Sequence, residues 1–354
     1  MFSEACRGAE QYSRLLVTSV RRQDGSVETS LSTFIVLNRE GWIVTAGHVF
    51  DSFKAYNDHQ KKIKEINELN GSRVSRPGSP DVKVKIDPKL IVNHSFWWGW
   101  DGVRINNVYV NRQLDVAVGR LEGFNPDWVR TYPVLRDPDG VRPGTSLCRA
   151  GFPLIAIKSE WDPDKSAFRI PRLKYGELIF FNEGIHSRTI DKGVTKADNY
   201  RMRYVETSTP GLRGQSGGPI FDREGRLYAM QVVTESVPMN IRPTVEYEGS
   251  TVVEHQFLNV GVGVHVGSIR EVLDSRGIRY DAEGDESGYR IVGRWRPRTG
   301  CRRRTPRRST ASTTAPCRGS RAGPASGWRP MSSCGRPSAR CSGPRSACGT
   351  CSPP

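Results

Sequence analysis

The last 60 residues of this 354-residue chain lack most of the residue types that build a folded core. From residue 295 to residue 354 there is no Leu, Ile, Val, Phe or Tyr, and no Lys, Asp or Glu. Such a segment cannot bury enough apolar surface to offset the entropy that is lost on ordering. We therefore expect a disordered tail rich in Arg, Pro, Ser, Gly and Cys at 295–354, preceded by a linker at 281–294.

The tail also carries most of the chain's excess charge and most of its cysteines. It contains 13 arginines and no acid, so the formal net charge falls from +16 to +3 without it. Six of the eight cysteines lie there, which leaves only Cys6 and Cys148 in the body. Two cysteines so far apart in sequence form no disulfide framework, which fits a reducing compartment. Three interpretations of the tail stay open: translation out of frame after a frameshift, an Arg-rich arm that binds nucleic acid or anionic lipid, and a solvated linker.

Long apolar runs are also missing. No segment approaches the roughly 18 consecutive apolar residues of a transmembrane helix, so no membrane span is predicted. The first residues include an early acid and no apolar stretch of the kind found in secretory signals. We therefore expect a soluble, cytoplasmic protein.

The rest of the chain consists mainly of short apolar runs that are separated by turn residues. This spacing favours a barrel or sandwich over alternating strands and helices. A capping box, with Ser268 as N-cap and Glu271 reaching back to it, predicts a helix at 268–277. Other helices are predicted at 2–12 and 60–69, and strands at 15–20, 33–37, 41–45, 82–86, 90–92, 114–121 and 146–151.

The motif with the most chemical content is Gly-Gln-Ser-Gly-Gly-Pro at 214–219. Glycines on both sides of Ser216 permit a tight backbone turn with positive φ, which holds a serine hydroxyl away from the chain. The N–H groups of Gly214 and Ser216 are then candidate donors to an oxyanion. Taken alone, the motif also fits a glycine-rich turn between strands.

Two further motifs carry a histidine and an aspartate. In Thr-Ala-Gly-His at 45–48, a β-branched strand ends in small residues, so His48 has room to act as a general base. In Leu-Asp-Val-Ala-Val at 114–118, Asp115 stands at the start of a buried strand, where a carboxylate needs a partner such as a histidine N–H. Each motif alone also fits a structural role, as a buried histidine or as a turn aspartate.

Together the three motifs resemble trypsin-like serine peptidases of the chymotrypsin class, most closely the bacterial HtrA-type and related intracellular branch. The order His, Asp, Ser with separations of 67 and 101 residues belongs to that resemblance, as does Val-Gly-Val-Gly-Val at 260–264. It covers about residues 13–277. It implies an all-β fold, a chymotrypsin-like double β-barrel with barrels at about 13–125 and 126–267, inside a peptidase domain at 13–280 that follows an N-terminal extension at 1–12.

The resemblance also implies a catalytic triad of His48, Asp115 and Ser216. One departure is Gln215, because the digestive branch carries an Asp there that captures a newly cut N-terminus. Activation by N-terminal cleavage is therefore not expected, and control by a protein partner, by oligomerisation or by loop ordering takes its place.

By the same resemblance, a specificity pocket is walled by residues 209–213, 232–236 and 261–265. Trypsin-like members carry an Asp where this chain has Pro210, so no preference for Arg or Lys is predicted. Glu235 either forms a negative wall or is a solvated carboxylate at the rim. The predicted substrate-binding residues are Pro210, Arg213, Val233, Thr234, Val262 and Gly263.

The resemblance finally implies a serine endopeptidase that cleaves protein or peptide substrates through an acyl-enzyme, with no cofactor and no metal site. Two alternatives stay open. One is a catalytically silent or partner-activated trypsin-like module in a bacterial stress or defence system. The other is a nucleic-acid-binding protein that acts through the basic tail.

Overall fold

The computed structural model describes residues 1–72, 83–153, 156–171, 178–240, 243–247, 250–253 and 256–284. The predicted tail at 295–354, and the predicted linker beyond residue 284, lie outside this range. Among the described residues, no helix combines the length and the apolar character that crossing a bilayer requires.

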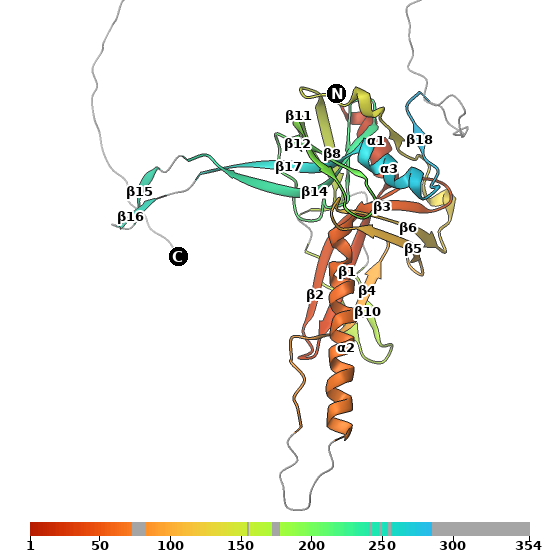
Figure 1. Ribbon diagram of the computed structural model, residues 1–354, viewed down its shortest axis with the longest axis vertical. Coiled ribbons are helices and arrows are strands. Elements are labelled where there is room, and N and C mark those ends of the chain that lie inside the picture. The colour runs from red at the N-terminus through yellow and green to blue at the C-terminus, as the bar shows by residue number, and fades with distance from the viewer. Residues whose placement is uncertain are drawn as a thin grey trace, which may run out of the picture. The chain divides into compact units, whose positions relative to one another are not determined.

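The first half of the chain forms a six-stranded antiparallel sheet with the order β4-β1-β2-β3-β6-β5. Its strands alternate or run continuously apolar where they face the core, and β1 buries Leu15, Leu16 and Val17 in succession. The sheet curls on itself (Figure 1). The strands are β1 (Ser13–Arg22), β2 (Val27–Val36), β3 (Trp42–Ala46), β4 (Ile91–Trp97), β5 (Arg104–Asn111) and β6 (Val116–Glu122).

The second half forms an eight-stranded sheet in which β13 pairs with both β8 and β14, so that six strands close into a ring. The short strands β7 and β18 extend it through parallel pairing with β14 and β7. Two curled sheets in sequence confirm the predicted double β-barrel. The strands are β7 (Val134–Leu135), β8 (Ser146–Gly151), β11 (Phe180–Val194), β12 (Arg201–Thr207), β13 (Pro219–Phe221), β14 (Arg226–Pro238), β17 (Phe257–His265) and β18 (Asp281–Ala282).

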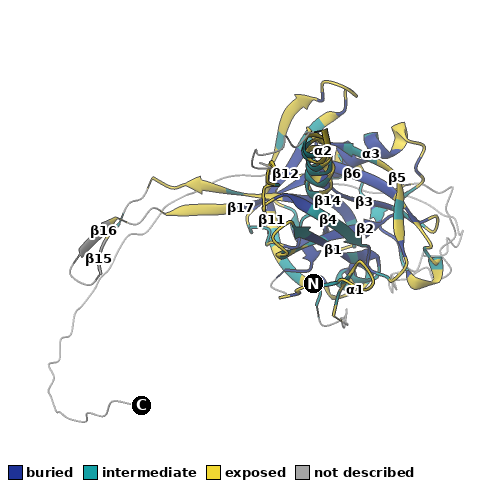
Figure 2. Cartoon of the chain, turned by 90° about the horizontal axis from the view of Figure 1, so that it is seen from below, coloured by how far each residue is buried: buried dark blue, intermediate teal, exposed yellow. Residues whose placement is uncertain are grey.

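One large apolar cluster spans both sheets and includes residues of the helices α1 (Ser3–Tyr12) and α3 (Val266–Ser275). Figure 2 shows the buried residues concentrated in the two barrels. Helix α1 contributes Ala5, Ala9 and Tyr12, so the segment predicted as an extension is packed into the core. At the other end, β18 occupies the first two residues that the sequence assigned to a linker.

The predicted capping box at Ser268 is wrong. Helix α3 begins earlier, at Val266, because the side chain of His265 accepts the Gly267 N–H at 2.9 Å and caps the helix. Inside the helix, Ser268 Oγ donates to the carbonyl oxygen of Arg201 instead. Glu271 accepts the N–H of the same residue, Arg201, at 2.7 Å, so both side chains fasten the helix to β12.

Helix α2 (Asp51–Ser72) is longer than the predicted helix at 60–69, because it continues directly from a 3-10 turn at Gly47–Phe50. It buries no residue and extends away from the barrels (Figure 1). The strand predicted at 82–86 does not form over residues 83–86. The backbone of Val84 bonds instead to the side chain of Asn70, through both its N–H and its carbonyl oxygen.

Three segments extend the second half beyond its barrel. The outer parts of β14 and β17 are mostly exposed and form a two-stranded arm that leads to the β15–β16 hairpin (Figures 1 and 2). A second hairpin lies between β8 and β11. These four strands are β9 (Glu160–Asp162), β10 (Ala167–Arg169), β15 (Thr244–Tyr247) and β16 (Ser250–Val253).

Candidate active site

His48 and Asp115 are joined by two hydrogen bonds. The Nδ1 atom of His48 lies 2.8 Å from Asp115 Oδ2, and the backbone N–H of His48 donates to Asp115 Oδ1 at 2.7 Å. The histidine lies in the 3-10 turn after β3, and the aspartate lies directly before β6, the strand that pairs with β3. Because both carboxylate oxygens are used, the position of the imidazole ring and its Nδ1 partner are fixed together.

A tight turn positions Asp115. The residue has a φ of 60°, a left-handed conformation that Asp tolerates better than most residues. In the same turn, the buried side chain of Asn111 accepts the N–H of Leu114 at 2.9 Å. Tyr204, from β12 in the second barrel, donates its hydroxyl to the carbonyl oxygen of Gln113 at 3.2 Å. Burial raises the pKa of Tyr204 to about 12, with Asp115 acting in the same direction, so the hydroxyl keeps its proton at neutral pH.

The loop that carries Ser216 is held by the first barrel. Thr33 of β2 donates from Oγ1 to the carbonyl oxygen of Gly214 at 2.7 Å, and from its N–H to the carbonyl oxygen of Ser216 at 2.8 Å. Gly214 and Gly217 have φ values of 97° and 83°, which other residues rarely adopt. A Cβ at Gly217 would also lie 3.0 Å from the backbone nitrogen of Ala46. Ser216 is therefore next to the strand end that leads to His48.

The predicted oxyanion donors have no hydrogen-bond partner within the part of the chain that the structure describes. Among the hydrogen bonds of the described residues, neither the N–H of Gly214 nor that of Ser216 takes part, whereas the neighbouring N–H groups of Gln215 and Gly217 are bonded. Over the same residues, Ser216 Oγ and His48 form no hydrogen bond. Such bonds are often long in a free enzyme and tighten when substrate binds.

Gln215, which stands where the digestive branch carries an Asp, is fully buried. Both the oxygen and the nitrogen of its side-chain amide form hydrogen bonds. Its Oε1 accepts the N–H of Leu212 at 2.9 Å, and its Nε2 donates to Asn182 Oδ1 of β11 at 2.8 Å. The loop before Ser216 is thus tied to the barrel by a neutral amide. This arrangement needs no charged N-terminus.

The predicted substrate-binding residues fall into two groups. Thr234 Oγ1 donates to the carbonyl oxygen of Gly211 at 2.6 Å, which joins two of the predicted pocket walls. Pro210, Arg213 and Val233 lie at least partly at the surface. Val262 and Gly263 do not: Val262 belongs to the large apolar cluster, and a Cβ at Gly263 would lie 2.6 Å from Ile220 Cδ1.

Sequence reasoning missed three residues that shape this site: Thr33, Asn182 and Arg149. Thr33 and Asn182 carry no motif, because their importance comes from contacts across the barrels. Arg149 had a usable signal. It is an arginine among mostly apolar residues of the strand predicted at 146–151, and in the structure only 3% of its surface is exposed. Its guanidinium bonds to the carbonyl oxygens of Thr209 and Pro210.

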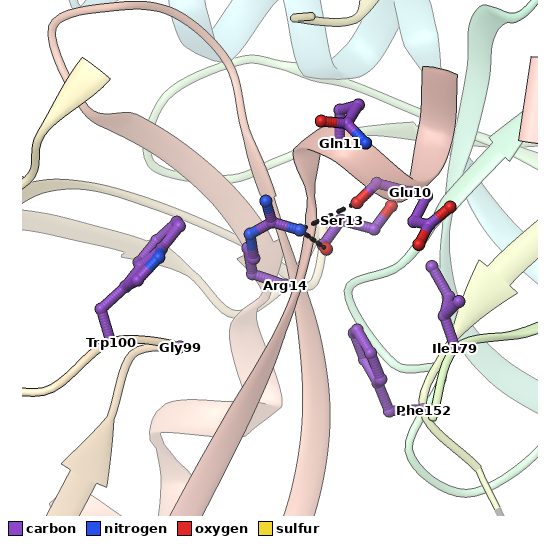
Figure 3. A pocket seen from close by; sticks show the side chains of 8 residues that line it. All are labelled: Glu10, Gln11, Ser13, Arg14, Gly99, Trp100, Phe152 and Ile179. Carbon is purple, nitrogen blue, oxygen red and sulfur yellow. Dashed lines mark hydrogen bonds between the residues drawn. The ribbon is translucent and has the colours of Figure 1, made fainter. Parts of the chain in front are cut away.

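A separate hollow of about 280 Å³ lies between the end of α1 and the residues that follow β4 and β8 (Figure 3). Arg14 lies on one side of it, held by the carbonyl oxygens of Glu10 and Ser13 and stacked over Trp100 at 5.2 Å. None of the predicted triad residues lines it.

The chain belongs to the trypsin-like peptidase domain family, because the family model matches residues 32–230, more than half of its length. This confirms the predicted family. No curated protein is significantly similar in sequence.

Solved structures that match this chain include the HtrA-type protease AlgW with a tripeptide, at 14% identity and a TM-score of 0.40. Another is an AlgW variant with a decapeptide, at 12% identity and a TM-score of 0.41. Both alignments cover 78% of this chain, and they cover 63% and 68% of the AlgW chains. The chain therefore spans about two thirds or less of the length of these proteins.

Proposed function

We propose that this protein is a serine endopeptidase with Ser216 as nucleophile, His48 as general base and Asp115 as the residue that orients the base. The observation that carries the proposal is the double hydrogen bond between His48 and Asp115, made beside a serine loop with two unpaired N–H groups. Protein or peptide substrates follow from the family.

In the proposed acylation step, Ser216 Oγ attacks the carbonyl carbon of the peptide bond and gives its proton to His48 Nε2. The carbonyl oxygen becomes an oxyanion and accepts the N–H groups of Gly214 and Ser216. The C–N bond then breaks, and the proton on His48 passes to the nitrogen of the leaving amine. Asp115 stays ionised and stabilises the imidazolium that forms in between.

Deacylation reverses these roles with water. His48 takes a proton from a water molecule while the water oxygen attacks the ester carbon. The bond from that carbon to Ser216 Oγ then breaks. The proton returns to Ser216 Oγ, and the free carboxylic acid leaves. Water is the only reactant besides the substrate, and Ser216 and His48 end the cycle in the protonation states in which they began.

Three further parts of the proposal concern setting and control. The expected cytoplasmic location fits Cys6 and Cys148, which are free thiols whose sulfur atoms share a hydrogen bond at 3.9 Å and form no disulfide. Because Gln215 already ties the serine loop to the barrel, we infer that activation does not use N-terminal cleavage. Activation by a protein partner is the second candidate, since Ser216 and His48 are not bonded to each other in the free chain.

The test is labelling with a fluorophosphonate probe, which reacts with an activated serine hydroxyl. We expect labelling at Ser216 in the wild type and none in Ser216→Ala, with hydrolysis of unfolded casein lost in parallel. Ser208→Ala, in a segment upstream of the same loop, is the matched control and should label normally. Casein hydrolysis that survives Ser216→Ala would disprove the assignment.

A further inference from the structure

Arg149 is a buried guanidinium with only neutral partners. It lies on β8 with 3% of its surface exposed. Its Nη1 donates to the carbonyl oxygen of Pro210 at 2.8 Å and to that of Thr209 at 3.3 Å. Its Nη2 donates to Thr207 Oγ1 at 2.5 Å and also to the Thr209 carbonyl oxygen at 3.3 Å.

The positive charge of this group is not compensated. No carboxylate of the described residues forms an ion pair with Arg149, and its Nε–H is buried without a hydrogen-bond partner. Burial lowers the pKa of Arg149 to about 10, so the group still carries its proton at neutral pH. A buried charge without a counter-charge is costly: removing one partner of a buried ion pair is among the largest single destabilising effects known in proteins. Arg149 is in the position of the partner left behind, so the site lacks an anion.

The guanidinium holds the segment that leads into the serine loop. Arg149 is two residues before Gly151, about 7 Å along the strand, and a Cβ at Gly151 would lie 2.8 Å from Gln215 Cα. The carbonyl oxygens that Arg149 holds belong to Thr209 and Pro210, a few residues before the oxyanion donors. A substrate whose carbonyl oxygen accepts those donors must place the side chain of that residue near this loop.

Gly261 of β17 completes the surroundings of the guanidinium. A Cβ at this position would overlap Nη2 of Arg149, so the absence of a side chain makes room for the charge. The group thus reaches two of the predicted pocket walls, at 209–213 and at 261–265. The hydrogen bond from Thr234 to Gly211 ties the third wall to the first.

We infer that Arg149 is a specificity residue, which selects substrates with Glu or Asp immediately before the cleaved bond. This inference rests on the proposed function. The substrate carboxylate accepts the unpaired Nε–H of Arg149 and supplies the missing negative charge, and Arg suits this role because its donors match a carboxylate. Arg149 also positions the loop through Thr209 and Pro210.

Two neighbours offer competing recognition. Arg213 is exposed beside Gly214 and also attracts acids, but an exposed charge is screened by salt, whereas a buried one is screened much less. Gln231 lies against Gly211 and has a buried amide oxygen without a partner. That oxygen accepts a hydrogen bond from the side-chain amide of a substrate Gln. A comparison of Glu with Gln therefore separates recognition by Arg149 from recognition by Gln231.

The experiment uses quenched fluorescent peptides of one sequence that differ only in the residue before the cleaved bond: Glu, Asp, Gln, Leu or Lys. We expect kcat/KM for Glu to exceed that for Gln by about 10- to 100-fold, the range for one hydrogen bond to a charged group. The ratio should persist in 1 M NaCl. Peptide aldehydes that end in Glu or Gln give the same comparison without turnover, as protection of Ser216 against the fluorophosphonate probe.

Variants then assign the preference. Arg149→Gln should bring the Glu to Gln ratio close to 1, whereas Arg7→Gln, the same charge change on exposed α1, should leave it unchanged. If Arg149→Gln does not fold, Arg149→Lys keeps the charge with a different donor geometry and should retain a reduced preference for Glu. A ratio that Arg213→Gln removes and Arg149→Gln keeps would overturn the inference.

The two proposals fail separately. If casein hydrolysis survives Ser216→Ala, the proposed function is wrong and the inference is lost with it. If the probe labels Ser216 and the wild type cleaves after Gln, Leu or Lys as well as after Glu, only the inference is wrong. Arg149 then serves the loop alone.

Discussion

Replacing Asp115 by Asn keeps the size of the side chain but changes what it presents to His48. The backbone N–H of His48 is a fixed donor, so the amide oxygen of the new side chain must stay on it. The amide NH2 group then faces Nδ1 of the imidazole, which has to become an acceptor. The ring proton moves to Nε2, the nitrogen that must receive the proton of Ser216.

The expected loss follows from this tautomer. In the trypsin template, the same change leaves the geometry intact and lowers kcat by about 10⁴. Here we expect a loss of the same order, about 5 kcal/mol of transition-state stabilisation. Stability should change little, since the Asp115 side chain is 26% exposed and no cavity forms.

The assay is the rate of fluorophosphonate labelling, together with peptide hydrolysis and a thermal denaturation curve. Asp101→Asn is the control, because it removes a charge from a loop of the same barrel, where the carboxylate accepts Trp97 Nε1–H. We expect near wild-type labelling in the control. An Asp115→Asn variant that labels within tenfold of the wild type would refute the orienting role.

Three more predictions follow from single contacts. Thr33→Val removes the hydroxyl that holds the carbonyl of Gly214, and should lower the free energy of unfolding by about 1–3 kcal/mol and slow probe labelling; unchanged labelling would show that the Gly214 peptide needs no such support. Burial lowers the pKa of His265 to about 3 against about 6.5 when unfolded, so the unfolded chain gains a proton first and stability falls as the pH drops from 6.5 towards 3. His265→Asn keeps a residue that can cap the helix but does not titrate, so urea titrations at pH 4 should show about 3 kcal/mol less loss of unfolding free energy than in the wild type. Equal losses in both proteins would contradict the assignment of this pH dependence to His265. Finally, diamide should link Cys6 to Cys148, whose sulfur atoms are 3.9 Å apart, and peptide mapping that finds only other cysteine pairs would count against their proximity.

The sequence was most informative where chemistry depends on short segments. The positions of His48, Asp115 and Ser216 each follow from a few neighbouring residues, and the barrel class follows from the spacing of short strands. Whether these side chains meet depends on contacts between strands far apart in the chain. The clamp that Thr33 places on the serine loop is such a contact, and no local pattern marks it.

Local signals also failed for identifiable reasons. The serine and glutamate of the supposed capping box bond to Arg201, because His265 had already capped the helix. Residues 83–86 alternate like a strand, but Val84 finds its partner in Asn70. Arg149 stood inside a correctly predicted strand, and its meaning depends on the absence of an acid around it, which only the fold reveals.

Because Thr33 of the first barrel holds the serine loop of the second, each half of the chain carries only part of the proposed active site. The piece that contains β1–β6 holds the base and its carboxylate, and the later piece holds the hydroxyl and the oxyanion donors without the threonine that steadies them. Two fragments divided between β6 and β7 should therefore be inert apart and should regain probe labelling when they reassemble. Probe labelling of Ser216 would then report directly on the association of the two fragments.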